Sequence, residues 1–418
     1  MTGIDSAEAA ARIFVALIGA AAVVALIARR TAFPYTIGLV VLGLVIALAG
    51  PPIDLELTPG LVLLILIPGL VFEAAYRIEI RQLTPVLGAT FLLAGPGVVI
   101  GALVTAVVLH LATGLAFSHA FLVGAMVSAT DPAAVVATFK RLRSPRRLST
   151  LVEAESLFND GTGVVLFGLA VEGLRRNVTL DAAAIDFLVT VVASTVLGIV
   201  TGALVARLVA RVGDHLIEMT FSLVLAYGTY LVAEGFQQSG IIATVAAGIT
   251  LGNYGRRVGL AETSLVALDT VWEFLAFLLN ALTFLLVGFA ISLDGLVAAA
   301  EPIAWGVVAI LVARAAFVYL GLRTWSSVGA RVRLGTALPS NWLHVVFWSG
   351  LRGAIAVALA LSLPTDLAER ELLQDITFGI VLFTLLAHGT TAELFLERAR
   401  VRDHDAPGDP GKPDWPFV

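Results

Sequence analysis

The stretch "VEAESLFNDGTGVVLFGLA" (residues 152–170) decides the fold, because it is a membrane-spanning segment with polar residues inside it. A spanning helix needs about 20 mostly apolar residues, and this stretch has that length. Glu153, Glu155, Asn159 and Asp160 nevertheless interrupt it. An ionised side chain at the centre of a spanning helix costs about 2.5–3.5 kcal/mol on insertion scales. The segment therefore predicts a functional site inside a membrane.

The composition of the whole chain agrees with a membrane protein. Hydrophobic residues make up 59% of the 418 residues, charged residues 14%, and the mean hydropathy is +0.96. Soluble chains carry about 25% charged residues. The absence of cysteine excludes disulfides, thiolate metal sites and cysteine nucleophiles. The first residues lack the basic region and cleavage site of a secretory signal, so we expect the first apolar segment to remain as a helix.

Long apolar runs without period-two alternation predict an all-α polytopic membrane protein rather than a β-barrel. We predict about 13 transmembrane helices, of which the ninth is the shortest. The segments are 11–28, 35–50, 60–76, 86–112, 119–139, 149–171, 184–210, 216–236, 240–253, 270–292, 302–322, 341–363 and 372–395.

The distribution of basic residues gives the orientation. Loops on the cytoplasmic side are enriched in Lys and Arg. With the N-terminus outside, 20 of the 26 basic residues lie on the inner side and four on the outer side. This distribution predicts an odd number of crossings with the C-terminus in the cytoplasm. The inner set is Arg29, Arg30, Arg77, Arg81, Lys140, Arg141, Arg143, Arg146, Arg147, Arg207, Arg211, Arg256, Arg257, Arg323, Arg331, Arg333, Arg398, Arg400, Arg402 and Lys412.

No loop is long enough to hold a second folded domain. We therefore expect one transmembrane domain over residues 1–398. The polar, proline-rich residues 399–418 predict a short disordered cytoplasmic tail. Because the sequence carries no nucleotide-binding module, we expect neither ATP nor any cofactor to take part, and no nucleic acid as a partner.

Asp131 lies near the middle of the fifth segment, in "MVSATDPAAVV". Pro132 removes a backbone donor and clashes with the preceding turn, so the helix should break around Thr130 and Asp131. Unpaired backbone groups at membrane depth persist only beside a cavity or a packed site. The alternative is a simple kink in which Asp131 caps the restarted helix.

On the sixth segment, residues four positions apart share a helix face. Ser156 and Asp160 form one such pair, and Glu155 and Asn159 form another on the adjacent face. This predicts one face for a cation and a second face for a structural partner. The alternative for Asp160 is a buried carboxylate that is merely hydrogen-bonded. Glu153 lies nearer the basic inner loop, where an interfacial ion pair is the favoured interpretation.

Two arginines lie within spans. Arg314 is deep in the eleventh segment, and a guanidinium stays protonated, so it requires a carboxylate, for which Glu155 is the best candidate. Arg352 lies between Gly350 and Gly353 in the twelfth segment. These glycines suggest a second interrupted helix with the cation near exposed carbonyls.

Two further polar residues have alternative interpretations. Glu73 is followed by Arg77 at the i,i+4 spacing of a helical ion pair, which explains it well. Asn280, in the tenth segment, could line a pathway or form a hydrogen bond across helices, and the sequence leaves both open.

Four stretches together resemble the monovalent cation:proton antiporter family 1, which includes the bacterial, plant and animal sodium/proton exchangers. They are "SATDPAAVVATFK", "LVEAESLFNDGTGVVLF", "LVARAAFV" and "GLRGAIAVALAL", and they occur in the family's order. The resemblance covers nearly the whole membrane domain. It implies an inverted-repeat antiporter fold with two interrupted helices, here segments five and twelve, that cross near the midplane. It also implies a homodimer in a bacterial or archaeal inner membrane.

The resemblance also implies a set of site residues. Asp131 and Asp160 would bind the cation, with oxygen ligands from Thr130, Ser156 and, as a further candidate, Glu155. Asn159 matches the Asn-Asp pair of electroneutral exchangers. Arg314 matches the expected partner of Glu155, and Arg352 matches the arginine at the second break. The long cytoplasmic regulatory tail of plant and animal members is missing here, so regulation through such a tail is not implied.

Elementary chemistry explains why carboxylates suit this function. A hard monovalent cation prefers oxygen ligands. A carboxylate removed from bulk water has a raised pKa, so protons compete with the cation near neutral pH. A site that holds either ion couples the two fluxes if access switches only when the site is occupied. Our hypothesis is that Asp160 carries the proton or the cation, that Asp131 completes the site, and that exchange is one for one.

Other function classes fit the sequence less well. Two aspartates inside a membrane, such as Asp131 and Asp160, are also a feature of an intramembrane aspartyl protease dyad that shares one proton. The contexts Ala-Thr-Asp-Pro and Phe-Asn-Asp-Gly differ from the Gly-x-Gly-Asp and Tyr-Asp contexts of that class. A channel or a carrier of organic solutes is disfavoured because few aromatic and polar residues lie within the spans. Selectivity among Na⁺, Li⁺ and K⁺ depends on cavity size and carbonyl placement, so a K⁺/H⁺ antiporter remains an alternative.

Overall fold

The fold was obtained as a computed structural model. It describes residues 3–31, 34–49, 60–142, 144–176, 179–258, 262–325 and 338–399. The tail predicted for residues 399–418 lies outside the described residues except for Ala399, as do Arg143, Arg331, Arg333, Arg400, Arg402 and Lys412 of the inner basic set.

Helices account for all the regular structure in the described part of the chain, and each of the thirteen predicted segments is helical. The first half contains α1 (Gly3–Thr31), α2 (Tyr35–Ala49), the π-helical η1 (Leu61–Leu66), α3 (Ile67–Arg77), α4 (Ile80–Leu83), α5 (Leu87–Ala94), α6 (Pro96–Thr113), α7 (Phe117–Met126), α8 (Ala133–Leu142), α9 (Arg146–Arg175) and α10 (Leu180–Val209). The second half contains α11 (His215–Gly235), α12 (Gly240–Thr250), η2 (Leu251–Gly255), α13 (Arg256–Val258), α14 (Glu262–Ala290), α15 (Leu293–Ala298), α16 (Ala300–Ala316), η3 (Phe317–Leu322), α18 (Ser340–Trp348), α19 (Ala354–Leu361) and α20 (Arg370–Arg398).

The protein has an all-α polytopic membrane fold. Seven helical stretches in the described residues are long and apolar enough to cross a bilayer, and three shorter apolar helices accompany them. The fourth predicted segment is divided into α5 and α6 at Pro96, which has no amide proton for a continuous helix and instead begins α6.

Segments five and twelve are interrupted, as predicted. Residues 127–132 separate α7 from α8, and residues 349–353 separate α18 from α19. Pro132 cannot donate to the preceding turn, which explains the first break. In the second break Gly350 packs against the Arg314 side chain, and a Cβ at this position would collide with the guanidinium.

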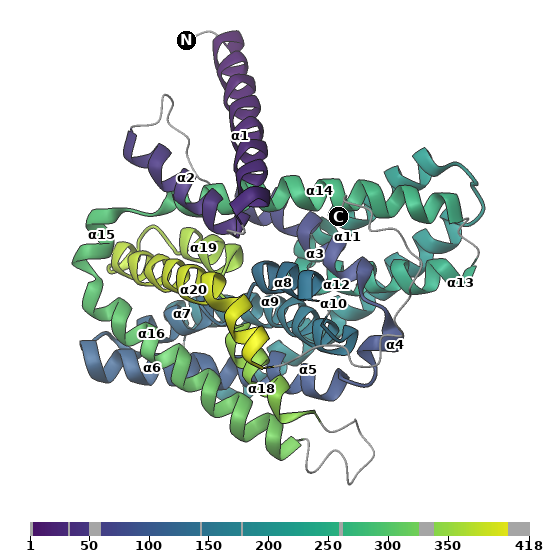
Figure 1. Cartoon of the computed structure of the whole chain (residues 1–418). Helices are drawn as coiled ribbons and strands as arrows, with labels where there is room; N and C mark the ends of the chain where they lie inside the picture. Colours follow the sequence, from purple (N-terminus) through teal and green to yellow (C-terminus); the bar gives the residue numbers. More distant parts are fainter. Residues whose placement is uncertain are drawn as a thin grey trace.

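The helices form two groups that meet at a central seam (Figure 1). One group contains α2, α3, α10, α11, α12 and α14, and the other contains α5–α9, α16 and α18–α20. Contacts between the groups run chiefly through α9, α12, α14 and α19. In this view α1 projects from the rest of the molecule.

The short ninth segment, α12, is buried at the centre of the first group. It packs against α10, α3, α11 and α9. Small residues make this possible, because Gly198 of α10 approaches the backbone of Ala243 so closely that a Cβ would collide with it. An apolar run of this length is typical of a helix covered by other helices, which explains why it is short.

Candidate functional site

The backbone of Thr130, in the first break, is held by side chains of α9. The Thr130 amide donates to Asn159 Oδ1 at 3.0 Å, and Asn159 Nδ2 donates to Thr130 Oγ1 at 2.7 Å. The Ser156 hydroxyl donates to the Thr130 carbonyl oxygen. All three residues are buried. The polar groups that Pro132 leaves outside a helix are therefore paired by α9, which is the condition for unwound backbone inside a bilayer.

The two breaks touch each other. The Asp131 amide donates to the Leu351 carbonyl of the second break at 2.8 Å. In the other direction, Arg352 Nη1 donates to the carbonyls of Ser128 at 2.6 Å and Ala129 at 3.2 Å. Arg352 thus lies near exposed carbonyls, as predicted, but those carbonyls belong to the first break.

The two aspartates differ in their surroundings, although both are partly buried. Asp131 Oδ1 accepts the Ala133 amide at 2.9 Å, so this carboxylate does cap α8, which was the alternative interpretation. Its other oxygen lies against Gly353, where a Cβ would collide with it. Asp160 makes no hydrogen bond and no ion pair with any described residue. It is residue 15 of the 30 in α9, which places it near mid-depth.

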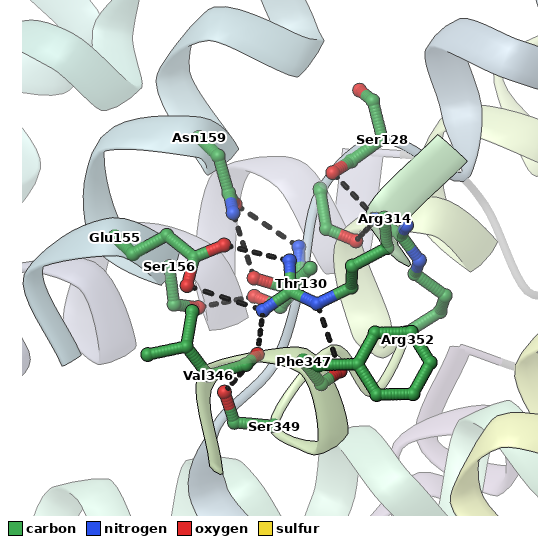
Figure 2. A network of polar contacts seen from close by, with 11 residues as sticks. Ser128, Thr130, Glu155, Ser156, Asn159, Arg314, Val346, Phe347, Ser349 and Arg352 are labelled. Atoms are coloured by element: carbon green, nitrogen blue, oxygen red, sulfur yellow. Dashed lines mark hydrogen bonds and ion pairs between the residues drawn. The ribbon is translucent and has the colours of Figure 1, made fainter. Parts of the chain in front are cut away.

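Arg314 is the centre of a second polar network (Figure 2). Its Nη1 and Nη2 donate to the two carboxylate oxygens of Glu155 at 2.8 and 3.2 Å, which confirms the predicted ion pair. Its Nε and Nη2 also donate to the carbonyls of Phe347 at 3.0 Å and Val346 at 2.6 Å. Arg314 therefore connects α16, α9 and the last turn of α18.

A cavity of about 40 Å³ lies beside this network, with room for about three water molecules. Arg314, Arg352, Glu155 and Asn159 line its polar side. Glycine and apolar residues of α5, α6, α7, α16 and η3 complete it. The Nε atom of Arg352 is buried and has no protein acceptor, which a water molecule in this cavity would supply.

Residues of α20 that were not predicted from the sequence hold the second break. Thr384 Oγ1 accepts the Arg352 amide at 3.0 Å. Trp348, which ends α18, stacks on Phe395 with ring centroids 3.9 Å apart and donates to Thr391 Oγ1 at 3.0 Å. All three partners lie on α20. The spacing of 384, 391 and 395 places them on one helix face, which is the signal that could have found them.

The ion pair predicted between Glu73 and Arg77 is present, and Glu273 of α14 lies 3.8 Å from Arg77 as a third member. Glu153 accepts the Ser149 hydroxyl at 2.5 Å.

Two interrupted helices that meet beside carboxylates at mid-depth define the broken-helix class of secondary transporters. Within that class the chain belongs to the family described as "Sodium/hydrogen exchanger, transmembrane", whose model matches residues 14–398.

Several named relatives support the assignment. The chain is 36% identical over 366 residues to the low-affinity Na(+)/H(+) antiporter NhaS1 of Synechocystis, a match covering 87% of this chain and 69% of that protein. It is 32% identical over 413 residues to the Na(+)/H(+) antiporter NhaG of Bacillus atrophaeus, covering 94% and 75%. The fold is similar to that of the sodium proton antiporter MjNhaP1 from Methanocaldococcus jannaschii, with a TM-score of 0.75, 20% identity and coverage of 94% and 99%.

Proposed function

We propose that this protein is a secondary active transporter that exchanges a monovalent cation, foremost Na⁺, for H⁺ by alternating access. The observation that carries the proposal is the state of Asp160. This carboxylate lies near mid-depth and has no hydrogen-bond or ion-pair partner among the described residues. An unpaired carboxylate in a membrane is costly, so it requires a proton or a cation. The named relatives, which are Na(+)/H(+) antiporters, support the same function.

In this proposal Asp160 carries the proton or the cation, and Asp131 completes the site. Asp131 keeps one oxygen for the cation, because only Oδ1 accepts the Ala133 amide. Thr130 and Ser156 add oxygen ligands, since Ser156 donates its only proton to Thr130 and retains its lone pairs. Glu155 has both oxygens on Arg314, so we assign it to supporting the site rather than to binding the cation.

Charge balance supports one-for-one exchange. The candidate site contains three carboxylates, Asp131, Asp160 and Glu155, and two guanidiniums, Arg314 and Arg352, so the sum of charges is 2 − 3 = −1. One proton or one monovalent cation makes the site neutral. Because a net charge at membrane depth is expensive, both loaded forms can change access more easily than the empty form. Asn159 is hydrogen-bonded to two atoms of Thr130 and carries no charge, so it leaves the net charge of the site at −1.

The exchange reaction is tested with purified protein in liposomes that contain a pH dye. A pH gradient is imposed, and Na⁺, Li⁺ or K⁺ is then added outside. We expect Na⁺ to collapse the gradient, whereas a response to K⁺ alone would identify a K⁺/H⁺ antiporter. A membrane potential imposed without a pH or cation gradient should drive no flux. Potential-driven flux would refute one-for-one stoichiometry, and a gradient insensitive to all three ions would refute antiport.

We further propose an inner-membrane location with the N-terminus outside and the C-terminus in the cytoplasm, which the inner basic set supports. Residues 1–398 would form the antiporter unit, followed by a short tail and assembled as a homodimer.

Gly353→Ala should weaken cation binding. The added methyl group would occupy the space of the Asp131 carboxylate and displace it from the site. We expect the KM for Na⁺ to rise about tenfold, which corresponds to the loss of about one charge-assisted contact. The measurement is the Na⁺ dependence of proton flux in liposomes.

Gly168→Ala, on the exposed side of α9, is the matched control, because its methyl group would meet no neighbour. Its KM should equal that of the wild type. A KM for Gly353→Ala that equals that of this control would show that the contact with Asp131 has no role in binding.

A further inference from the structure

Asn280 is a polar residue within a predicted membrane span, and it has no role in the transport site described above. It lies ten residues before the end of α14, hence about 15 Å from that end and near the middle of a hydrocarbon layer about 30 Å thick. Its amide offers up to four hydrogen bonds. Its side chain forms none of them with any described residue. The sequence left open a cross-helix hydrogen bond for this residue, and the structure contains no such bond within the described residues.

The position of Asn280 around α14 is found by comparison with the residues that contact α2 and α3. Leu285 lies against Gly43 of α2, and Leu279 lies against Gly69 of α3. At about 100° per residue, Asn280 is about 100° from Leu279 and about 140° from Leu285. Asn280 is therefore on a third face of the helix, between the side that contacts α2 and the side that contacts α3.

Part of this third face is covered by protein. Ala276, Thr283 and Val287 share it with Asn280, and they are 7%, 2% and 2% exposed. Within the second helix group, α14 contacts α19, the helix that begins immediately after the second break. Asn280 itself is only half-buried.

A second polar group on the same face also lacks a partner. The Thr283 hydroxyl is buried and makes no hydrogen bond, not even to the carbonyl one turn earlier. Threonines in apolar helices usually make that bond, as Thr377 of α20 does with Leu373 at 2.8 Å. Two neighbouring polar groups at mid-depth thus have hydrogen bonds that the described residues do not make and that water or an ion would supply.

We propose that Asn280 is a specificity-determining residue on the cation pathway. Its amide oxygen replaces one water molecule of the partly dehydrated cation as the ion passes along the seam between α14 and α19 toward Asp131 and Asp160. An amide suits this role because it provides an oxygen ligand for a hard cation and adds no charge to the −1 of the site. The inference rests on the exchange function proposed above and adds a polar residue of α14 to that pathway.

The test compares Asn280→Leu, which keeps the volume but removes the oxygen, with wild type in liposomes. We expect the KM for Na⁺ to rise about tenfold and the ratio of the Na⁺ and Li⁺ KM values to change. The kcat of the variant should stay within about twofold of the wild-type value, because the proton site is untouched. The pH dependence of its transport rate should match that of the wild type for the same reason. Asn280→Gln, which retains the oxygen, should recover most of the affinity. Asn280→Ala provides the same comparison should the leucine variant fail to fold.

Phe274→Leu, at a position of the same helix that is 63% exposed, is the matched control. If the KM values of Asn280→Leu equal those of the wild type, or if its kcat falls while KM stays constant, the role proposed for Asn280 is overturned. The exchanger proposal would remain intact in either case. An inactive wild type would overturn both proposals, so the two failures are distinguishable.

Discussion

Asp160→Asn should abolish cation-driven proton flux, reducing it to the level of protein-free liposomes, at least about 100-fold below wild type. The substitution keeps the size of the side chain but removes its charge and its titratable proton. In this variant the charges of Asp131, Glu155, Arg314 and Arg352 sum to zero without any ion. A bound cation would therefore leave a net positive charge near mid-depth of the membrane. Neither the proton nor the cation retains a carrier. The measurement is dye dequenching after addition of Na⁺ to liposomes with an imposed pH gradient.

Two controls make this result specific to the transport site. Asp181→Asn removes a carboxylate at the exposed start of α10 and should transport like wild type. Size-exclusion profiles and thermal unfolding should show that Asp160→Asn is folded, because no described residue loses a hydrogen bond. Flux above about one tenth of wild type in Asp160→Asn would exclude this carboxylate as the shared carrier of both ions.

Arg314→Leu should cause the largest loss of stability. The substitution leaves Glu155, which is 2% exposed, without its bidentate partner. It also removes the Arg314 donors from the carbonyls of Phe347 and Val346, of which Val346 still accepts the Ser349 hydroxyl. Breaking a buried ion pair from one side costs about 3–5 kcal/mol, because the remaining charge is desolvated and unpaired. We expect a lower Tm in detergent and a loss of transport, since the same residue holds α18 beside the second break.

A double variant separates the unpaired charge from the lost packing. Glu155→Leu combined with Arg314→Leu removes both charges, so it should unfold at a higher temperature than Arg314→Leu alone. It should remain below wild type, because the hydrogen bonds from Arg314 to the carbonyls of Val346 and Phe347 are still missing. A double variant no more stable than Arg314→Leu would show that the carbonyl contacts, and not the buried carboxylate, dominate the loss.

The spanning segments were predictable because they depend on local sequence. A run of about 20 apolar residues is stable in a bilayer only as a helix, whatever its neighbours are. The break at Pro132 follows from the chemistry of proline alone. The pairing of Arg314 with Glu155 was predictable for a different reason: an arginine in a membrane must have a carboxylate, and few were available.

The partners of the unwound backbone were not predictable. The carbonyls of Leu351, Val346 and Phe347 are present in any chain. Only the meeting of the two breaks makes Leu351 an acceptor for Asp131, and only the position of Arg314 beside the last turn of α18 makes Val346 and Phe347 its acceptors. Likewise, the roles of Thr384 and Trp348 depend on α20 lying beside the second break. Such contacts join residues distant in sequence, and no local pattern encodes them.

The sequence by itself determined that the chain is a bundle of membrane helices, with carboxylates and guanidiniums at mid-depth and two interrupted segments. The tertiary structure decided which of those polar groups are satisfied. Glu155 has both oxygens on Arg314, and Asn159 is held by Thr130, whereas Asp160 has no partner in the described part of the chain. The physical reason is that helix periodicity fixes only the face on which a side chain lies, while hydrogen bonding inside a bilayer depends on which other helix and which unwound backbone reach that face.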